Sequence, residues 1–446
     1  MRKKRHFTSF QIISLGFLIV ILTGSFLLML PISTNGPGGA SFWDSLFTAT
    51  SAVCVTGLVL HDTAQYWSYF GQFVIITLIQ IGGMGVVTVS IAIAMLSGRK
   101  IGLMQRSTMC EAISAHHVGG IVRMTGFILK TTMMIEVTGA AVMFPVFCRD
   151  FGVLKGLWYS LFHSISAFCN AGFDLLGVRQ EFSSLTTYAD NPVINLTIMA
   201  LIVIGGIGFL TWDDIKTHKL HIKKYRMQSK VILTVTSLLI LLPALYFYFV
   251  EFSADKWSDM SLSERILGSF FQSVTPRTAG FNTVDLTALS EAGVFIMIIL
   301  MITGGSPGST AGGIKTTTIA VLFSSALAVF KRKGETNCFH RRISENTVNH
   351  AATILLMYLV LFLSGGIAIS CIEGIPILDC LFETASAIGT VGLTLGITTE
   401  LSLISRFILI VLMFWGRVGG LTLVFAAISS RHLDVSKFPM EKITVG

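Results

Sequence analysis

The chain has 446 residues and a formal net charge of +8, and 52% of its residues are hydrophobic while only 13% are charged. Soluble domains usually carry about 25% charged residues, so this composition, with a mean hydropathy of +0.75, excludes a soluble globular protein and indicates an integral membrane protein. The seven cysteines are scattered without C-x-x-C or metal-ligand spacing, which argues against a disulfide framework and against a cysteine metal site.

Eight hydrophobic stretches are long enough, at about 20 residues, to cross a bilayer as helices. In chain order they cover residues 10–30, 71–97, 124–147, 193–212, 231–250, 293–330 (interrupted), 347–371 and 403–429. No small-residue cleavage site follows the first stretch, so we interpret it as a retained helix rather than a signal peptide.

Lysine and arginine are distributed unequally between the segments that connect these stretches. The amino terminus, the carboxyl tail and the loops 98–123, 213–230 and 331–346 hold 22 of them, whereas the segments on the opposite side hold six. Because positive charge is retained on the cytoplasmic side, this bias predicts a multi-pass protein with both termini in the cytoplasm. The net charge therefore reflects topology, and we expect no nucleic-acid partner.

Four short segments, each between two hydrophobic stretches, share one pattern. In each, a Phe is followed by Ser, Thr and small residues and, ten positions later, by a glycine that precedes Leu or Phe. The glycines lie 115, 108 and 112 residues apart, which indicates a fourfold internal repeat. Each segment is too short to span a bilayer, so we expect it to be re-entrant.

The predicted fold is an all-α polytopic membrane protein built from four helix–pore loop–helix repeats. It has eight transmembrane helices and four re-entrant pore helices around a pseudo-fourfold pore. We expect the repeats at residues 1–97, 98–212, 213–331 (with a broken inner helix) and 332–446 (with a cytoplasmic tail).

The glycine of each segment readily adopts positive φ, which allows the carbonyls before it to turn towards the axis. Four pore helices would aim their negative carboxyl ends at the same cavity, which favours a desolvated cation. We therefore expect an ion-binding selectivity filter made of backbone carbonyls. Its residues are Val55, Thr56, Gly57, Asn170, Ala171, Gly172, Thr278, Ala279, Gly280, Thr390, Val391 and Gly392.

Two of these segments, Val-Thr-Gly-Leu at 55–58 and Thr-Val-Gly-Leu at 390–393, look like shortened potassium-channel filters. With LLMLPIS at 27–33, SAFCNAGF at 166–173 and TPRTAGFN at 275–282, the whole chain resembles the Trk/Ktr/HKT potassium transporter superfamily. The resemblance is strongest to the membrane subunit of the bacterial Ktr potassium-uptake system.

The resemblance implies a K⁺-translocating homodimer in the bacterial plasma membrane, with one pore per subunit and K⁺ as the only metal bound. It also implies regulation by a cytosolic octameric ring of Rossmann-type subunits that bind ATP or ADP, so we expect no cofactor in this chain. A channel filter has two glycines, whereas each segment here has one. We therefore expect a preference for K⁺ rather than strict exclusion of Na⁺.

The third inner stretch contains five glycines and a proline within residues 304–313, a composition that cannot form a regular helix. Irregular backbone at membrane depth is tolerated only where it is buried in protein or lines a cavity. We expect a mobile gate below the filter, and the resemblance agrees. Its residues are Gly304, Gly305, Ser306, Pro307, Gly308, Ser309, Thr310, Ala311, Gly312 and Gly313, with Lys315 and Arg417.

Arg417 is a charge inside an apolar stretch, and such residues are functional candidates. We expect it just below the filter, where it holds the loop, although structural pairing with a carboxylate or with loop carbonyls is an alternative. The glycines of 82–85 and 205–208 fit close helix packing or proximity to the pore. Changes in the loop are expected to leave the K⁺ preference of the filter largely intact.

We expect this chain to conduct K⁺ inward, driven mainly by the membrane potential, and not to be an enzyme. The sequence has no G-x-x-x-x-G-K-[ST] phosphate loop, no paired catalytic carboxylates and no Ser/His/Asp arrangement. One alternative is a K⁺ symporter coupled to Na⁺ or H⁺, for which Glu136 is the one candidate carboxylate at the midplane. Another is the ion-conducting subunit of an ATP-driven cation pump.

Overall fold

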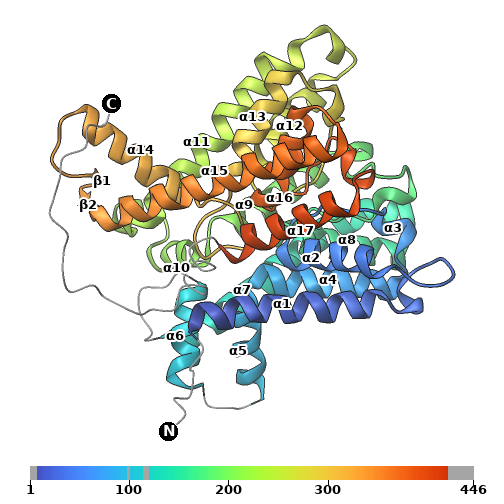
Figure 1. Ribbon diagram of the computed structural model, residues 1–446, viewed down its shortest axis with the longest axis horizontal. Helices are drawn as coiled ribbons and strands as arrows, with labels where there is room; N and C mark the ends of the chain where they lie inside the picture. The colour runs from blue at the N-terminus through green and yellow to red at the C-terminus, as the bar shows by residue number, and fades with distance from the viewer. Residues whose placement is uncertain (1–7, 98–100, 114–119, 420–446) are drawn as a thin grey trace.

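The computed structural model describes residues 8–97, 101–113 and 120–419, and helices dominate it throughout (Figure 1). The first repeat contains α1 (Ser9–Leu28), η1 (Pro31–Ser33), the pore helix α2 (Phe42–Cys54), α3 (Thr63–Tyr66), α4 (Tyr69–Met84) and α5 (Val86–Leu96), and α6 (Leu103–Ala112) follows. The second contains α7 (Ile121–Phe151), the pore helix α8 (Val153–Phe168), η2 (Leu176–Val178), η3 (Thr186–Tyr188), α9 (Pro192–Gly206) and α10 (Phe209–His218).

In the third and fourth repeats an outer helix, a pore helix and an inner helix again follow one another. The third contains η4 (Ile222–Lys224), α11 (Met227–Phe249), η5 (Glu251–Ser253), η6 (Asp255–Trp257), the pore helix α12 (Leu262–Val274), η7 (Leu286–Ala288), α13 (Glu291–Ile302) and α14 (Thr316–Phe330). The fourth contains β1 (Asn337–Cys338), β2 (Arg341–Arg342), α15 (Glu345–Glu373), the pore helix α16 (Ile377–Gly389), η8 (Ile397–Thr399) and α17 (Leu403–Val418).

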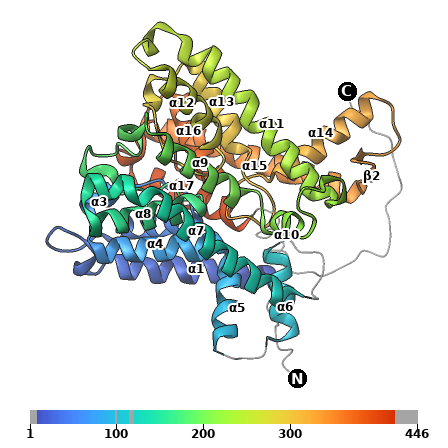
Figure 2. The ribbon, with the colours of Figure 1, turned by 180° about the vertical axis from the view of Figure 1, so that it is seen from behind.

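The packing of these helices closes a circle. The outer helices α1, α7, α11 and α15 are long and apolar enough to cross a membrane, and each packs on the pore helix of its own repeat. Each inner helix packs on the pore helix of the next repeat: α9 on α12, α13 on α16, α17 back on α2, and α4 on α8. The last pair is seen in Figure 2. This cyclic arrangement confirms the predicted fold of four helix–pore loop–helix repeats.

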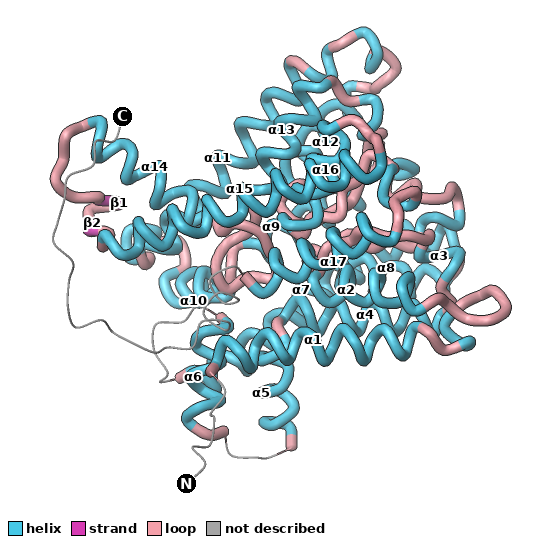
Figure 3. The backbone as a smooth tube through the Cα atoms, in the orientation of Figure 1, coloured by secondary structure: helices cyan, strands magenta, loops and turns pink. Residues whose placement is uncertain are grey.

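The inner helices are less regular than the sequence predicts. The stretches 71–97 and 193–212 were expected to be continuous, and this expectation is wrong: α4 and α5 meet at 96°, and α9 and α10 meet at 97° (Figure 3). The breaks fall at Gly85 (φ 85°) and Gly208 (φ 90°), because a residue in this conformation ends an α-helix. A bend therefore exists in the first two inner helices as well as in the expected third one.

The fourth inner helix ends in the same way. α17 stops at Val418, and Gly419 follows with φ 90°. The remainder of the predicted stretch 403–429 lies outside the described residues.

Side-chain caps begin two of the pore helices, and left-handed residues end two of them. The Ser41 hydroxyl accepts the N–H of Asp44 at the start of α2, and Ser261 forms a capping box with Glu264 at the start of α12. At the other end, α2 stops at the left-handed residue Val55 and α16 stops at Thr390. In the first and fourth repeats the chain therefore leaves the helix three residues before the glycine of the repeated pattern.

One element was not anticipated. β1 and β2 pair antiparallel, with Asn337 opposite Arg342, in the basic loop 331–346. This hairpin, together with α14 and the start of α15, extends to one side of the helical body (Figure 1).

Candidate functional site

The four glycine-containing segments meet around one axis. A Cβ added to any of their glycines would lie less than 3.0 Å from a carbonyl oxygen of the following repeat. The pairs are Gly57 with Ala171, Gly172 with Ala279, Gly280 with Val391, and Gly392 with Thr56. The fourth contact returns to the first repeat, so the segments form a closed ring, and the residue that contributes the oxygen is in every case the one before the glycine.

The backbone conformation at the ring is the same in all four repeats. Two positions before each glycine stands a residue in the left-handed region: Val55 (φ 58°), Asn170 (φ 61°), Thr278 (φ 66°) and Thr390 (φ 52°). The glycines themselves have φ between 70° and 95°. Non-glycine residues rarely adopt this conformation, and such outliers cluster at functional sites.

The ring carbonyls have no hydrogen-bond donor. The N–H groups of Thr56, Ala171 and Val391 each donate at 2.8 Å to a carbonyl near the end of their own pore helix. No N–H or O–H of the described residues donates to the carbonyl oxygens of Thr56, Ala171, Ala279 and Val391, although these residues are fully buried. Buried carbonyls are normally paired, and four unpaired carbonyl oxygens in one ring are the kind of group that can replace the hydration shell of a cation.

Four hydroxyl groups support the ring from behind, and the sequence analysis did not identify them. Ser51 and Ser386 each accept the N–H of their glycine, Gly57 and Gly392, at 3.0 Å. Ser166 and Thr275 donate at 2.7 Å to the carbonyls of Phe173 and Phe281, which follow the other two glycines. The sequence pattern that could have identified them is a Ser or Thr five or six positions before each glycine.

The irregular segment 304–313 lies against the bend between α9 and α10. Ser306 N–H donates to the carbonyl of Gly206 at 3.0 Å, and Phe209 N–H donates to the carbonyl of Gly308 at 2.7 Å. The segment also reaches the ring, because a Cβ added to Gly313 would lie 3.1 Å from the carbonyl oxygen of Gly389. The loop therefore packs between the bend of the second inner helix and the end of the fourth pore helix, next to the ring of glycine-containing segments.

Arg417 and Lys315 both bind carbonyl groups of this loop region. The Arg417 guanidinium donates to the carbonyls of Thr310 in the loop and of Gly82 at the end of α4, and to that of Gly83 at 3.1 Å. Lys315 Nζ donates to the carbonyls of Ala311 at 2.8 Å and Gly312 at 3.2 Å. Among the described residues neither side chain has a carboxylate partner.

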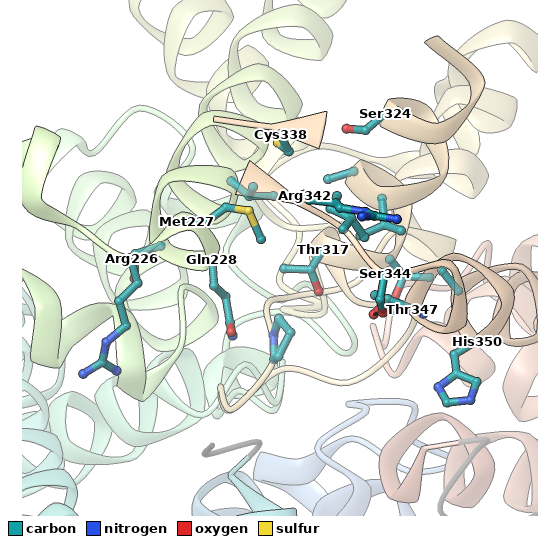
Figure 4. A pocket seen from close by; sticks show the side chains of 18 of the residues that line it. Arg226, Met227, Gln228, Thr317, Ser324, Cys338, Arg342, Ser344, Thr347 and His350 are labelled. Carbon is teal, nitrogen blue, oxygen red and sulfur yellow. Dashed lines mark hydrogen bonds between the residues drawn. The ribbon is translucent and has the colours of Figure 1, made fainter. Parts of the chain in front are cut away.

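Two cavities lie on either side of the loop. The first, about 310 Å³, is lined by Arg417, Lys315, Gly308 and Gly313. The second, about 740 Å³, lies between α11, α14, the β1–β2 hairpin and α15 (Figure 4). Pro307 of the loop also lines it. Its lining includes Arg226 and Arg342 from the basic loops 213–230 and 331–346, so the cavity brings these two loops next to the segment 304–313.

Glu136 lies apart from the ring. Its buried carboxylate in α7 accepts the Gln80 amide at 3.0 and 3.2 Å, and no cation of the described residues pairs with it. The structure thus places this carboxylate between an outer and an inner helix, behind the second pore helix rather than at the axis.

Comparison with known proteins then identifies the family. The model of the TrkH family, described as cation transport protein, matches residues 3–434. The chain belongs to this family. It is a membrane ion transporter of the Trk/Ktr superfamily and not an enzyme, as the sequence predicted.

Individual relatives cover the chain almost completely. The chain is 40% identical to the potassium/sodium uptake protein NtpJ of Enterococcus hirae, over 100% of this chain and 99% of that protein. It is 38% identical to the Ktr system potassium uptake protein B of Bacillus subtilis, over 99% of this chain and 97% of that protein. The crystal structure of the potassium transporter TrkH from Vibrio parahaemolyticus has the same fold, with a TM-score of 0.74 at 19% identity over 95% of this chain and 86% of that one.

Proposed function

We propose that the chain takes up K⁺ through a channel-like pore whose selectivity filter is the ring of single-glycine segments. The observation that carries the proposal is the set of four buried carbonyls without donors, those of Thr56, Ala171, Ala279 and Val391. Carbonyl oxygens can replace the hydration shell of K⁺, and the names of the relatives from E. hirae and B. subtilis both include potassium uptake. A membrane potential of 100 mV supplies roughly 2.3 kcal/mol per charge, enough for about fiftyfold accumulation.

The loop 304–313 is the proposed gate of this pore. It lies next to the filter segments. Arg417 and Lys315 donate charge-assisted hydrogen bonds to five carbonyls, three in the loop and two at the end of α4. Its glycines supply the conformational freedom that opening requires. In the closed state Arg417 therefore joins the loop to the first inner helix.

The chain is proposed to function as a Ktr-type homodimer in the bacterial plasma membrane, with both termini in the cytoplasm and a cytosolic octameric ring of nucleotide-binding subunits as its regulator. The positive-inside charge distribution supports this orientation. The cavity between the two basic cytoplasmic loops supports the partner, because Pro307 lines it and a protein bound there would act on the gate (Figure 4).

Uptake of ⁸⁶Rb⁺ into proteoliposomes that contain this chain alone tests the function. The voltage and the Na⁺ gradient are varied independently. Uptake that follows the voltage in the absence of Na⁺ is expected, and uptake that requires a Na⁺ gradient contradicts it.

A K⁺ symporter coupled to Na⁺ is the second candidate, and one observation favours it. Glu136 is a buried carboxylate in a membrane helix without a cationic partner among the described residues. The same proteoliposome experiment separates the two functions. An ATP-driven pump would in addition require an ATPase that co-purifies with the chain.

A further inference from the structure

The gate loop and the filter are joined by a side-chain hydrogen bond. Thr310 Oγ1 in the loop lies 3.0 Å from Asn170 Oδ1 in the second filter segment, and it is also 3.1 Å from the carbonyl oxygen of Phe168. Both side chains are buried, with 0% and 1% exposure. Water therefore cannot replace this bond when it breaks.

Asn170 extends the connection to the third filter segment. Its Nδ2 donates to the carbonyl of Arg277 at 3.3 Å and to that of Ile202 at 3.4 Å. Arg277 directly precedes Thr278, which holds the left-handed position of the third segment. The other repeats have Val55, Thr278 and Thr390 where the second has Asn170, so only this repeat has an amide side chain at that position.

The same loop residue is held from the opposite side by Arg417. The backbone carbonyl of Thr310 accepts the Arg417 guanidinium while its hydroxyl binds Asn170. A second contact lies nearby, because a Cβ added to Gly312 would meet the side chain of Thr390 in the fourth segment. If the loop moved away from Arg417, it would consequently lose its contacts with the second and the fourth filter segments.

We infer that the Thr310–Asn170 hydrogen bond makes the ion preference of the filter depend on the position of the loop. Thr310 and Asn170 are positioning residues for selectivity: the bond fixes the Asn170 amide, and through it the left-handed backbone of the second and third segments. The inference rests on the proposed function. It reverses the expectation from sequence that loop changes leave the K⁺ preference intact.

The test uses the full chain in proteoliposomes and two readouts, the K⁺/Na⁺ permeability ratio from the reversal potential and the Rb⁺ flux at fixed voltage. Thr310→Val removes the hydroxyl at nearly constant volume, and Thr310→Ser restores it. Asn170→Gly removes the acceptor and suits the left-handed backbone. Thr303→Val is the matched control, because the Thr303 hydroxyl donates only to Ile299 of its own helix, at 3.1 Å.

Thr310→Val is expected to lower the permeability ratio by about tenfold, the factor that corresponds to about 1.4 kcal/mol for one lost buried hydrogen bond. Thr310→Ser should restore the ratio and Thr303→Val should retain it. Asn170→Gly also removes the bonds to the Arg277 and Ile202 carbonyls, so its loss should be at least as large, and the double variant should lose no more than Asn170→Gly alone.

Two results overturn the inference. One is a Thr310→Val variant that keeps the wild-type ratio, whatever its flux. The other is a double variant whose losses add. If Thr310→Val fails to assemble, Thr310→Ala, which also removes the hydroxyl, takes its place in the same comparison. The proposed filter can stand even if this coupling fails. In that case the K⁺/Na⁺ permeability ratio is unchanged in Thr310→Val but altered in variants of the filter glycines.

Discussion

The hydroxyl of Ser51 accepts the backbone N–H of Gly57 at 3.0 Å, across the end of the first pore helix. Ser386 holds Gly392 in the same way at 3.0 Å. These bonds occupy the N–H of the glycine, so the peptide before it is fixed with its carbonyl towards the axis. Repeats one and four therefore share one support, and repeats two and three use a hydroxyl that donates to the carbonyl after the glycine instead.

Ser51→Ala is predicted to weaken the ring. It leaves the buried N–H of Gly57 without an acceptor, at a cost of about 1–3 kcal/mol. Rotation of the peptide would relieve part of this cost and turn the ring carbonyl away from the cation. If about 1.4 kcal/mol is transferred to K⁺ binding in this way, the apparent K⁺ affinity should fall by about tenfold. The measurement is the concentration dependence of Rb⁺ uptake in proteoliposomes.

Ser45→Ala is the control for this variant. The Ser45 hydroxyl lies in the same pore helix and is buried without a hydrogen-bond partner among the described residues. Equal affinities for Ser51→Ala and wild type would show that the hydroxyl does not support the ring.

Substitution of a ring glycine by serine is predicted to lower K⁺ affinity and discrimination against Na⁺. At Gly57, Gly172, Gly280 or Gly392 the new Cβ would collide with a carbonyl of the next repeat and would also occupy a positive-φ position. Gly374→Ser is the matched control, since Gly374 has φ 69° and open space around its Cβ position. Wild-type affinity and selectivity in all four ring variants would exclude the carbonyl ring as the filter.

Arg417→Gln is predicted to raise Rb⁺ flux at fixed voltage. Glutamine cannot reach the carbonyls of both Thr310 and Gly83 with charge-assisted bonds, each of which contributes about 1.5–3 kcal/mol. The loop should therefore spend more time displaced, and dependence on a cytosolic regulator should decrease. Flux is measured per inserted chain, with surface expression determined in parallel.

Arg265→Gln provides the comparison for Arg417. Arg265 also binds a backbone carbonyl, that of Tyr248 at 3.1 Å, but it lies at the start of a pore helix, away from the loop. If the Rb⁺ flux of Arg417→Gln is equal to that of Arg265→Gln, or lower, the loop is a structural part of the conduction path.

Glu136→Gln is predicted to leave voltage-driven Rb⁺ uptake in place. Glutamine can keep a hydrogen bond with Gln80, so the packing of α7 against α4 should persist while the charge is removed. Loss of uptake in a correctly inserted variant, together with loss of a Na⁺ dependence present in the wild type, would instead support the symport function.

The sequence was sufficient for the architecture because the same pattern occurs four times. Positive φ at Gly57 and its three equivalents, the ends of the pore helices and the irregular segment 304–313 all follow from local composition. The bends at Gly85 and Gly208 did not follow, because a glycine-rich segment inside an apolar helix fits close packing equally well.

The hydrogen bond between the loop 304–313 and the second glycine-containing segment could not be predicted from local sequence, for a different physical reason. Thr310 and Asn170 are 140 residues apart, and nothing in either segment indicates the other. Only the packing of the loop 304–313 against the second repeat brings them together. The partners of Arg417 are backbone carbonyls, which carry no residue-type signal.

The most direct test of the account is the position of Rb⁺ in an experimental structure of the full chain, determined from its anomalous scattering. The account predicts a peak on the axis, at a similar distance from the carbonyl oxygens of Thr56, Ala171, Ala279 and Val391. A cation found only at side-chain oxygens, or no peak at the ring under conditions that support Rb⁺ uptake, would contradict it.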